Sequence, residues 1–240
     1  MLCDSAAAAL SFRIAGEHHR IFHVRNTCKQ LNSAPRGVFL ALLSFSVAAH
    51  PHSFIRLKTE VLADNGQFTG LKMRWTMDEI TSADLLYDAG NAKPGEEIWK
   101  NWRRKSWLTY WVSTILPEVW HGGQKVKFLN RPTEYGMERE GHQAVLTFIL
   151  PLAQPQPLHG QTYTFATFDP TYYVDMSYEH DSDASLPGAL QTSCNVAVHT
   201  PETLGDEVLN YAQSLDKEDA PEEDMQLGKQ FAQTVTLACQ

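Results

Sequence analysis

The stretch Phe54-Ile-Arg-Leu-Lys-Thr-Glu-Val-Leu62 decides the fold class of this chain. Apolar residues alternate with charged or polar ones along it, which is the period-two pattern of a strand with one buried face. The tripeptide Asp64-Asn65-Gly66 follows and offers the residues of a tight hairpin turn. A second alternating run extends from Phe68 to Trp75. The two runs together predict a β-hairpin.

Further strands are predicted towards the C-terminus, where runs rich in β-branched and aromatic residues recur. These runs are Lys125–Leu129, Gln143–Leu150, Thr162–Phe168, Tyr172–Met176, Gln191–Val198 and Gln230–Cys239. Pro151, Pro155 and Pro157 are expected to break the chain between two of these strands. Many short strands separated by turns are typical of a β-sandwich, so the predicted fold is mainly β.

Three helical segments are expected among the strands. A short helix is predicted over Thr76–Tyr87, and another near residues 203–215, before the last strand. Residues 96–120 contain five of the six tryptophans at mostly helical spacing, with Pro117 as a stop signal. We expect this Trp-rich helical insertion to pack its aromatic side chains on the core. A membrane-surface or partner-docking face is the alternative.

Residues 36–49 have the pattern of a secretory signal peptide. The apolar run Val38–Ala49 ends with small residues, Val47 and Ala49, at the two positions that signal peptidase reads. The run is shorter than the roughly 20 residues that span a bilayer. Residues 1–35 are too long and too mixed for the start of a signal peptide, which favours a start codon assigned too far upstream. Cleavage after Ala49 would leave residues 50–240 as one periplasmic domain without a transmembrane segment.

The charge balance argues against one class of partner. The chain has 20 Lys and Arg residues and 28 Asp and Glu residues, a net charge of −8. Residues 1–49 hold five of the basic and two of the acidic residues, so residues 50–240 have 15 basic, 26 acidic and a net charge of −11. Because such a surface repels phosphate, no nucleic-acid binding is expected. The same surface is compatible with a protein that handles cations.

Cys194 and Cys239 are the two cysteines of the expected mature chain. In an exported protein they most simply form one disulfide, which would close a loop of about 45 residues and stabilise the fold by about 3–4 kcal/mol in the chain-entropy model. A Cys/His metal site is the alternative, although neither cysteine has a Cys or His neighbour at zinc-finger spacing.

The expected mature terminus, His50-Pro51-His52, is a candidate chelating end. Cleavage would give His50 a free amine beside its imidazole, with a second imidazole two residues later. Pro51 has no N–H, so the square-planar mode that uses deprotonated backbone amides is blocked. The His50 amine, His50 Nδ1 and the His52 imidazole remain as donors. Imidazoles suit several ions, so Zn²⁺ is expected, with Ni²⁺, Co²⁺ and Cu²⁺ as alternatives. Solvated histidines near a chain end are the simpler interpretation.

Three other residues are candidate metal ligands: Asp169, Asp78 and His180. Asp169 precedes Pro170 and is equally typical of a turn, and Asp78 is equally suited to cap a helix. His180 belongs to the local cluster Glu179-His180-Asp181.

Enzyme signatures are missing from the sequence, which has no Gly-x-Ser-x-Gly, no Walker loop and no His-Glu-x-x-His. We therefore expect no enzyme. Two alternatives remain open. One is an exported β-sandwich that binds a partner without metal. The other is a copper-dependent oxidative enzyme with a histidine brace, in which His121, His142 or His180 would supply the distant imidazole.

Four features occur together across residues 50–240. They are His50-Pro51-His52, Trp75-Thr-Met-Asp-Glu79, Phe168-Asp-Pro-Thr-Tyr-Tyr173, and the late cysteines Cys194 and Cys239. With these four features the sequence resembles a bacterial periplasmic family of unknown function, whose members are often labelled as periplasmic components of ABC-type transport systems. That family is similar to zinc-utilisation accessory proteins. The resemblance implies a periplasmic accessory for transition-metal transport, with an inner-membrane metal permease of the nickel/cobalt type as its partner.

Overall fold

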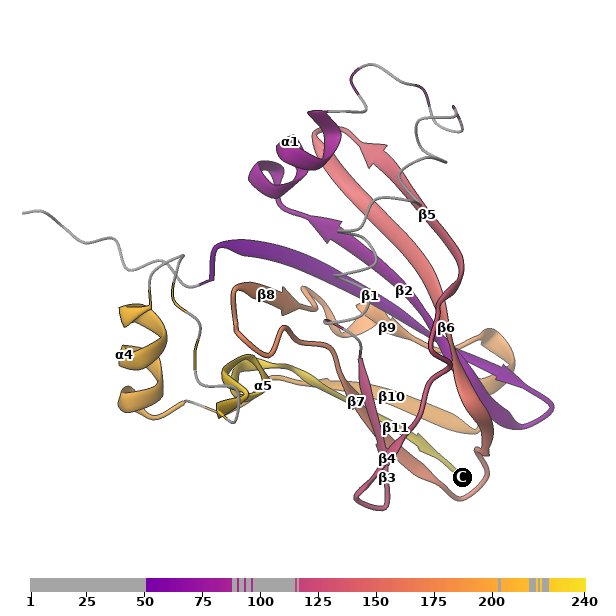
Figure 1. The fold of residues 1–240 in the computed structure, drawn as a ribbon. Coiled ribbons are helices and arrows are strands. Elements are labelled where there is room, and N and C mark those ends of the chain that lie inside the picture. The colour runs from indigo at the N-terminus through magenta and orange to yellow at the C-terminus, as the bar shows by residue number, and fades with distance from the viewer. Residues whose placement is uncertain are drawn as a thin grey trace, which may run out of the picture. The chain divides into compact units, whose positions relative to one another are not determined.

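Two β-sheets form the described part of this protein. The computed structural model describes residues 51–87, 90, 93, 96, 115, 117–202, 204–215, 219, 221 and 225–240. The chain divides into the units Met1–Phe45 and Ser46–Gln240, and every described residue belongs to the second unit. Strands of the same sheet can be followed side by side in Figure 1.

The first sheet has the order β5 (Thr133–Glu140), β6 (Gln143–Pro157), β2 (Gln67–Met77), β1 (Ser53–Asp64) and β8 (Val174–Ser177), and β9 (Ala184–Ser185) also pairs with β1. The second has the order β10 (Cys194–His199), β11 (Thr234–Cys239), β7 (Thr162–Ala166), β3 (Glu118–His121) and β4 (Gln124–Val126). The described helices are α1 (Glu79–Tyr87), α4 (Asp206–Ser214) and α5 (Leu227–Phe231), with short 3-10 turns η2 (Asp181–Asp183) and η3 (Gly188–Leu190). The mainly β, two-sheet architecture predicted from the sequence is confirmed.

The predicted hairpin is the centre of the first sheet. Strands β1 and β2 pair antiparallel from Ile55 opposite Met77 to Asp64 opposite Gln67. The two residues between them, Asn65 and Gly66, have φ of 49° and 75°. Positive φ at both turn positions matches the right-handed twist of the flanking strands. Alternation along β1 then buries one face and leaves the other in solvent.

The core lies between the inner faces of the two sheets. Its largest fully buried side chains include Trp75, Phe148 and Leu71 from the first sheet and Tyr163 and Phe165 from the second. The Trp75 and Phe148 rings meet edge to face with centroids 4.9 Å apart. Because both sheets contribute to a single cluster of buried residues, neither inner face is stable without the other.

The prolines of β6 do not break the strand, contrary to the sequence-based expectation. β6 continues through them to Pro157, and its register with β2 shifts between Phe68 and Gly70. In this segment the Ala153 N–H donates to the Lys127 carbonyl, and the Leu129 N–H donates to the Pro151 carbonyl. Proline only removes a donor, so it is tolerated where the ladder uses its carbonyl or where one side of the strand is unpaired.

Two of the three helical expectations, those for Thr76–Tyr87 and for residues 203–215, were right in type and partly wrong in extent. Helix α1 begins at Glu79, because Thr76 and Met77 still belong to β2. Helix α4 matches the segment expected near 203–215, but α5 occupies the first part of Gln230–Cys239 and β11 begins only at Thr234. Trp120 lies on β3 rather than on a helix, after the predicted stop at Pro117. The rest of the Trp-rich segment, residues 97–114, lies outside the described residues.

In the described part of the chain, no helix is both long enough and apolar enough to cross a membrane.

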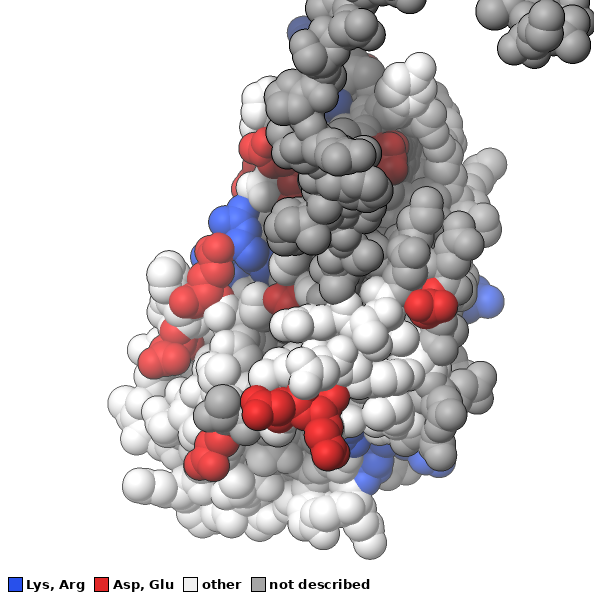
Figure 2. Space-filling view, turned by 90° about the vertical axis from the view of Figure 1, so that its left-hand side faces the viewer, with Lys and Arg blue, Asp and Glu red and all other residues white. Residues whose placement is uncertain are grey.

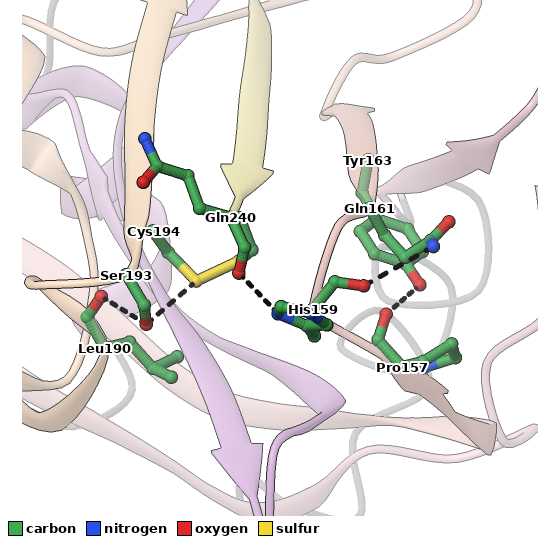
Figure 3. Close-up of a disulfide and its surroundings, with 9 residues drawn as sticks. Pro157, His159, Gln161, Tyr163, Leu190, Ser193, Cys194 and Gln240 are labelled. Atoms are coloured by element: carbon green, nitrogen blue, oxygen red, sulfur yellow. Dashed lines mark hydrogen bonds between the residues drawn. A yellow bond between two sulfur atoms is a disulfide. The ribbon is translucent and has the colours of Figure 1, made fainter.

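The predicted disulfide joins the last two strands of the second sheet. Cys194 on β10 lies directly opposite Cys239 on β11, and the two sulfurs are bonded. Figure 3 shows the bond beside Gln240, whose carbonyl is 2.8 Å from His159 Nδ1. The Gln240 N–H also donates to the Ser193 carbonyl. The chain end is therefore fixed covalently and by hydrogen bonds, and the alternative Cys/His metal site is not formed.

Candidate functional site

The beginning of β1 is held against the loop that precedes β8. The backbone N–H groups of His52 and Ser53 both point to the Tyr173 carbonyl, at 2.9 and 3.3 Å. The His52 and Tyr173 rings also touch, with centroids 4.9 Å apart. Ser53 then pairs in parallel with Val174. We call the segment from His52 to Phe54 the β1 start. Its position is fixed two residues after the expected mature terminus.

Asp78 fixes the β1 start from the side of β2. Its Oδ2 accepts hydrogen bonds from the Phe54 N–H at 2.8 Å and from the Ser53 hydroxyl at 3.2 Å. Its Oδ1 accepts from the Thr81 N–H at 2.8 Å, which is the N-cap bond of α1. Burial raises the pKa of Asp78, but the N–H groups of Phe54 and Thr81 and the hydroxyls of Thr81 and Ser53 outweigh it, and the pKa lies below its ordinary value. The helix-cap interpretation of Asp78 is confirmed.

Asp169 fixes the other side of the β1 start. It is buried, and its carboxylate accepts from the Thr171 N–H at 3.0 Å, the Thr171 hydroxyl at 2.9 Å and the Val174 N–H at 3.0 Å. The Val174 residue that it holds is the one paired with Ser53. Helix α5 packs on the same turn, where the Gly228 N–H donates to the Pro170 carbonyl at 3.2 Å. The turn interpretation of Asp169 is therefore also confirmed.

A third carboxylate, Asp175, lies beside Phe54 in the register of β8 and β1. Burial raises the pKa of Asp175, and a hydrogen bond with Ser177 reverses this only in part. Burial, together with the charge of Asp175, raises the pKa of Tyr172 to about 12. The Tyr172 ring stacks on Phe231 with centroids 3.9 Å apart. Three acidic residues thus surround the β1 start, and they produce a local field that attracts cations.

His180, the remaining candidate ligand, lies further along β1. Its N–H donates to Asp183, and Asp183 in turn pairs with Lys58 at 3.0 Å. The preceding Glu179 pairs with Arg56 at 3.3 Å. Arg56 is four residues beyond His52, or roughly 13 Å at the rise of a strand. The structure therefore does not bring His180 to the β1 start.

The histidines considered for a copper brace are also dispersed. His121 lies on β3 in the other sheet, where its Nε2 is 2.8 Å from Gln161 Oε1. His142 is exposed in the turn between β5 and β6. Across the described ranges, no three or more His, Cys, Asp and Glu side chains form a group that could hold a metal ion. His50 lies outside those ranges, so its geometry with His52 is not described.

Comparison with known proteins places the chain in a family. The sequence profile of a family described as "Protein of unknown function (DUF1007)" matches residues 36–239. The chain belongs to the DUF1007 family. An uncharacterized protein of Haemophilus influenzae is 35% identical over 210 residues, which cover 85% of this chain and 96% of that protein. No solved structure matches the chain.

Membership of DUF1007 confirms that the chain belongs to a family of unknown function, while the periplasmic location, the His-Pro-His terminus and the transport role stay predictions. For this DUF1007 protein, sequence reasoning found Asp78 and Asp169 but missed Asp175. The signal was present in the run Tyr172–Met176, because period-two alternation places Asp175 on the face opposite the buried Val174 and Met176.

Proposed function

We propose that this DUF1007 protein is an exported, periplasmic accessory protein that binds a transition-metal ion, Zn²⁺ first, and hands it to an inner-membrane permease of the nickel/cobalt type. In this role the chain binds and transfers an ion and catalyses no reaction. The observation that carries the proposal is the anchoring of His52. Its backbone bond to Tyr173 and its ring contact give a candidate ligand next to the mature terminus a defined position.

The proposed donors are the His50 amine, His50 Nδ1 and the His52 imidazole. The described residues do not supply a complete site by themselves, since they contain no group of three or more candidate ligands. A site made of one anchored imidazole and one terminal residue leaves coordination positions open. Open coordination positions suit an ion that the protein passes on, because ligands of the receiving permease can bind the ion before the ligands of this protein release it.

Asp78 and Asp169 serve this site by holding the backbone around His52. Asp78 accepts hydrogen bonds from the Phe54 and Thr81 N–H groups, and Asp169 accepts from the N–H groups of Thr171 and Val174, the second of which pairs with Ser53. Metal ligation by Asp78, Asp169 or His180 stays a prediction, and for either aspartate it would require these bonds to be exchanged. Without ligating, the carboxylates still raise the local cation concentration.

Zinc titration of two histidine variants tests the proposal. His52→Gln removes the anchored imidazole, and we expect the mature protein to bind Zn²⁺ at least tenfold more weakly, as measured by competition with a chromophoric chelator. His142→Gln is the matched control, because His142 is exposed in the turn between β5 and β6, two strands that do not pair with β1. Equal affinities of the two variants would contradict the assignment of His52.

A partner-binding role without metal is the second candidate function. It is favoured by exposed apolar side chains at the same place, since Phe54 is 52% exposed, Tyr173 42% and Ile80, two residues after Asp78, 83%. Such residues are typical of a docking surface. This candidate predicts that the mature protein shows no saturable zinc binding at all, whereas the metal-accessory proposal requires it.

A further inference from the structure

A polar groove, separate from the β1 start, lies between strand β4 and the last part of β6. Its volume is about 400 Å³, within the range of small-ligand sites. The residues that line it are His121, Gln124, Lys125, Val126, Lys127, Ala153, Gln154 and Gln156. Two lysines, three glutamines and a histidine are among them, and no Asp or Glu is. This composition differs from that of a chain with a net charge of −8.

The groove forms because two strand segments separate. The Lys127 carbonyl accepts a hydrogen bond from the Ala153 N–H at 2.8 Å, and Phe128 bridges to Leu152. On one side of this junction β4 pairs with β3, whereas on the other Ala153 and Gln154 lie in the register break of β6, between Pro151 opposite Gly70 and Gln156 opposite Phe68. The space between β4 and β6 is therefore bounded by the outer strand of the second sheet and by the side of β6 that faces away from β2. Its backbone walls belong to two sheets that share one core, which fixes its width.

The wall at His121 is also rigid. The His121 ring lies against Tyr163 with centroids 4.6 Å apart, and its Nε2 is bonded to Gln161. Tyr163 is fully buried, and its hydroxyl donates to the Pro157 carbonyl, as the right-hand side of Figure 3 shows. A ligand in the groove would therefore meet a fixed wall at His121, while the exposed lysine and glutamine side chains would lose rotamer freedom on binding.

Electrostatics select the class of ligand. Of the two lysines that line the groove, Lys125 pairs with Glu118, a carboxylate that it shares with Lys229 outside the lining. Lys127 forms no ion pair in the described part of the chain, so its positive charge is not neutralised there. On the face shown in Figure 2, by contrast, acidic side chains are spread widely over the described surface. A basic groove in an acidic protein attracts anions to one place.

We infer that the groove between β4 and β6 binds a small organic acid, whose carboxylate meets the Lys127 and Lys125 ammonium groups while the glutamine amides donate to and accept from its polar substituents. Ammonium groups bind carboxylates as point charges, and amides can satisfy hydroxyl, amino or carbonyl groups of the same molecule. This inference is independent of the metal site at the β1 start.

Titration of the metal-free, ¹⁵N-labelled mature protein with succinate tests the inference. We expect succinate to shift the backbone amide resonances of Lys127 and Gln154 in a saturable way. Succinamide, which has the same shape without charge, should leave them unchanged. Lys127→Gln should weaken succinate binding about tenfold, the effect of losing one hydrogen bond to a charged group. The control Lys72→Gln, on the outer face of the first sheet beside Glu60, should bind like the wild type.

Three results would overturn the inference. One is the absence of saturable shifts at millimolar succinate, and another is equal binding of succinate and succinamide. The third is equal succinate affinity of Lys127→Gln and Lys72→Gln. That result would leave the lysines with the role of discouraging edge-to-edge pairing at an outer strand. Tighter binding of inorganic phosphate than of succinate would replace the carboxylate class by phosphate and would contradict the inference as stated.

Discussion

Asp78 offers the sharpest test of how the β1 start is held. Asp78→Ala removes the acceptor of the Thr81 N–H, the Phe54 N–H and the Ser53 and Thr81 hydroxyls. Loss of an N-cap costs about 1 kcal/mol. Each of the two bonds to the β1 start adds roughly 0.5–1 kcal/mol, at the lower end because the site is partly exposed and water replaces the carboxylate. We therefore expect unfolding free energy to fall by about 2–3 kcal/mol in total.

Asp78→Asn separates the cap from the charge. Asparagine caps a helix as well as aspartate does, so the Thr81 bond survives, but its amide NH₂ cannot accept from the Phe54 N–H. The pKa of Asp78 is below its ordinary value in the folded protein, although burial by itself raises it. The carboxylate therefore stabilises the fold above the ordinary aspartate pKa, and this contribution is lost as pH falls through the folded-state pKa. The gap between wild type and Asp78→Asn should close below about pH 4.

Urea unfolding at neutral and acidic pH measures both effects. Asp84→Ala is the matched control, because Asp84 lies exposed on the same helix and caps nothing. A loss for Asp78→Ala no greater than that for Asp84→Ala would refute the assignment of Asp78 as the clamp on β1. If the difference in unfolding free energy between wild type and Asp78→Asn is the same at acidic and neutral pH, the stabilising role of the Asp78 charge is refuted.

Three further predictions concern the turn, the disulfide and the terminus. Gly228→Ala would place a Cβ 1.8 Å from the Asp169 carbonyl oxygen, so we expect a loss of about 2–3 kcal/mol in urea unfolding. Gly188→Ala, where a Cβ meets nothing within 4 Å, should change little, and equal losses would contradict the close packing of α5. Thiol counting of the denatured, unreduced mature protein should find no free thiol, since Cys194 and Cys239 are paired; two thiols would contradict the pairing. The intact mass of exported protein should correspond to His50 as the first residue, and retention of residues 1–49 would be inconsistent with the chelating terminus.

The hairpin and the disulfide could be predicted because their signals are local or compositional. Alternation from Phe54 to Leu62 and the pair Asn65-Gly66 specify a strand and its turn without reference to the rest of the fold. Residues 50–240, the expected mature chain, contain two of the four cysteines, and these two leave a single pairing. In both cases the residue types alone specify the feature, so it can be predicted without knowing the tertiary structure.

The missed elements depend on tertiary context. β5 is rich in charged residues, and its apolar alternation is limited to Tyr135 and Met137. The next residue on that face is Arg139, which donates to the Leu86 and Gly90 carbonyls. The prolines of β6 were misinterpreted because their tolerance depends on which side of the strand is paired. The groove between β4 and β6 has no sequence signal, since its two walls are about 30 residues apart in the chain.

The most direct test of the central claim compares two termini by zinc titration. One protein begins at His50, and the other has a single glycine before His50, which moves the free amine away while both imidazoles stay. The account predicts that the authentic terminus binds one Zn²⁺ at least tenfold more tightly, and that binding weakens on acidification because amine and imidazole coordinate only when neutral. Equal zinc affinity of the two proteins would contradict the terminal chelate.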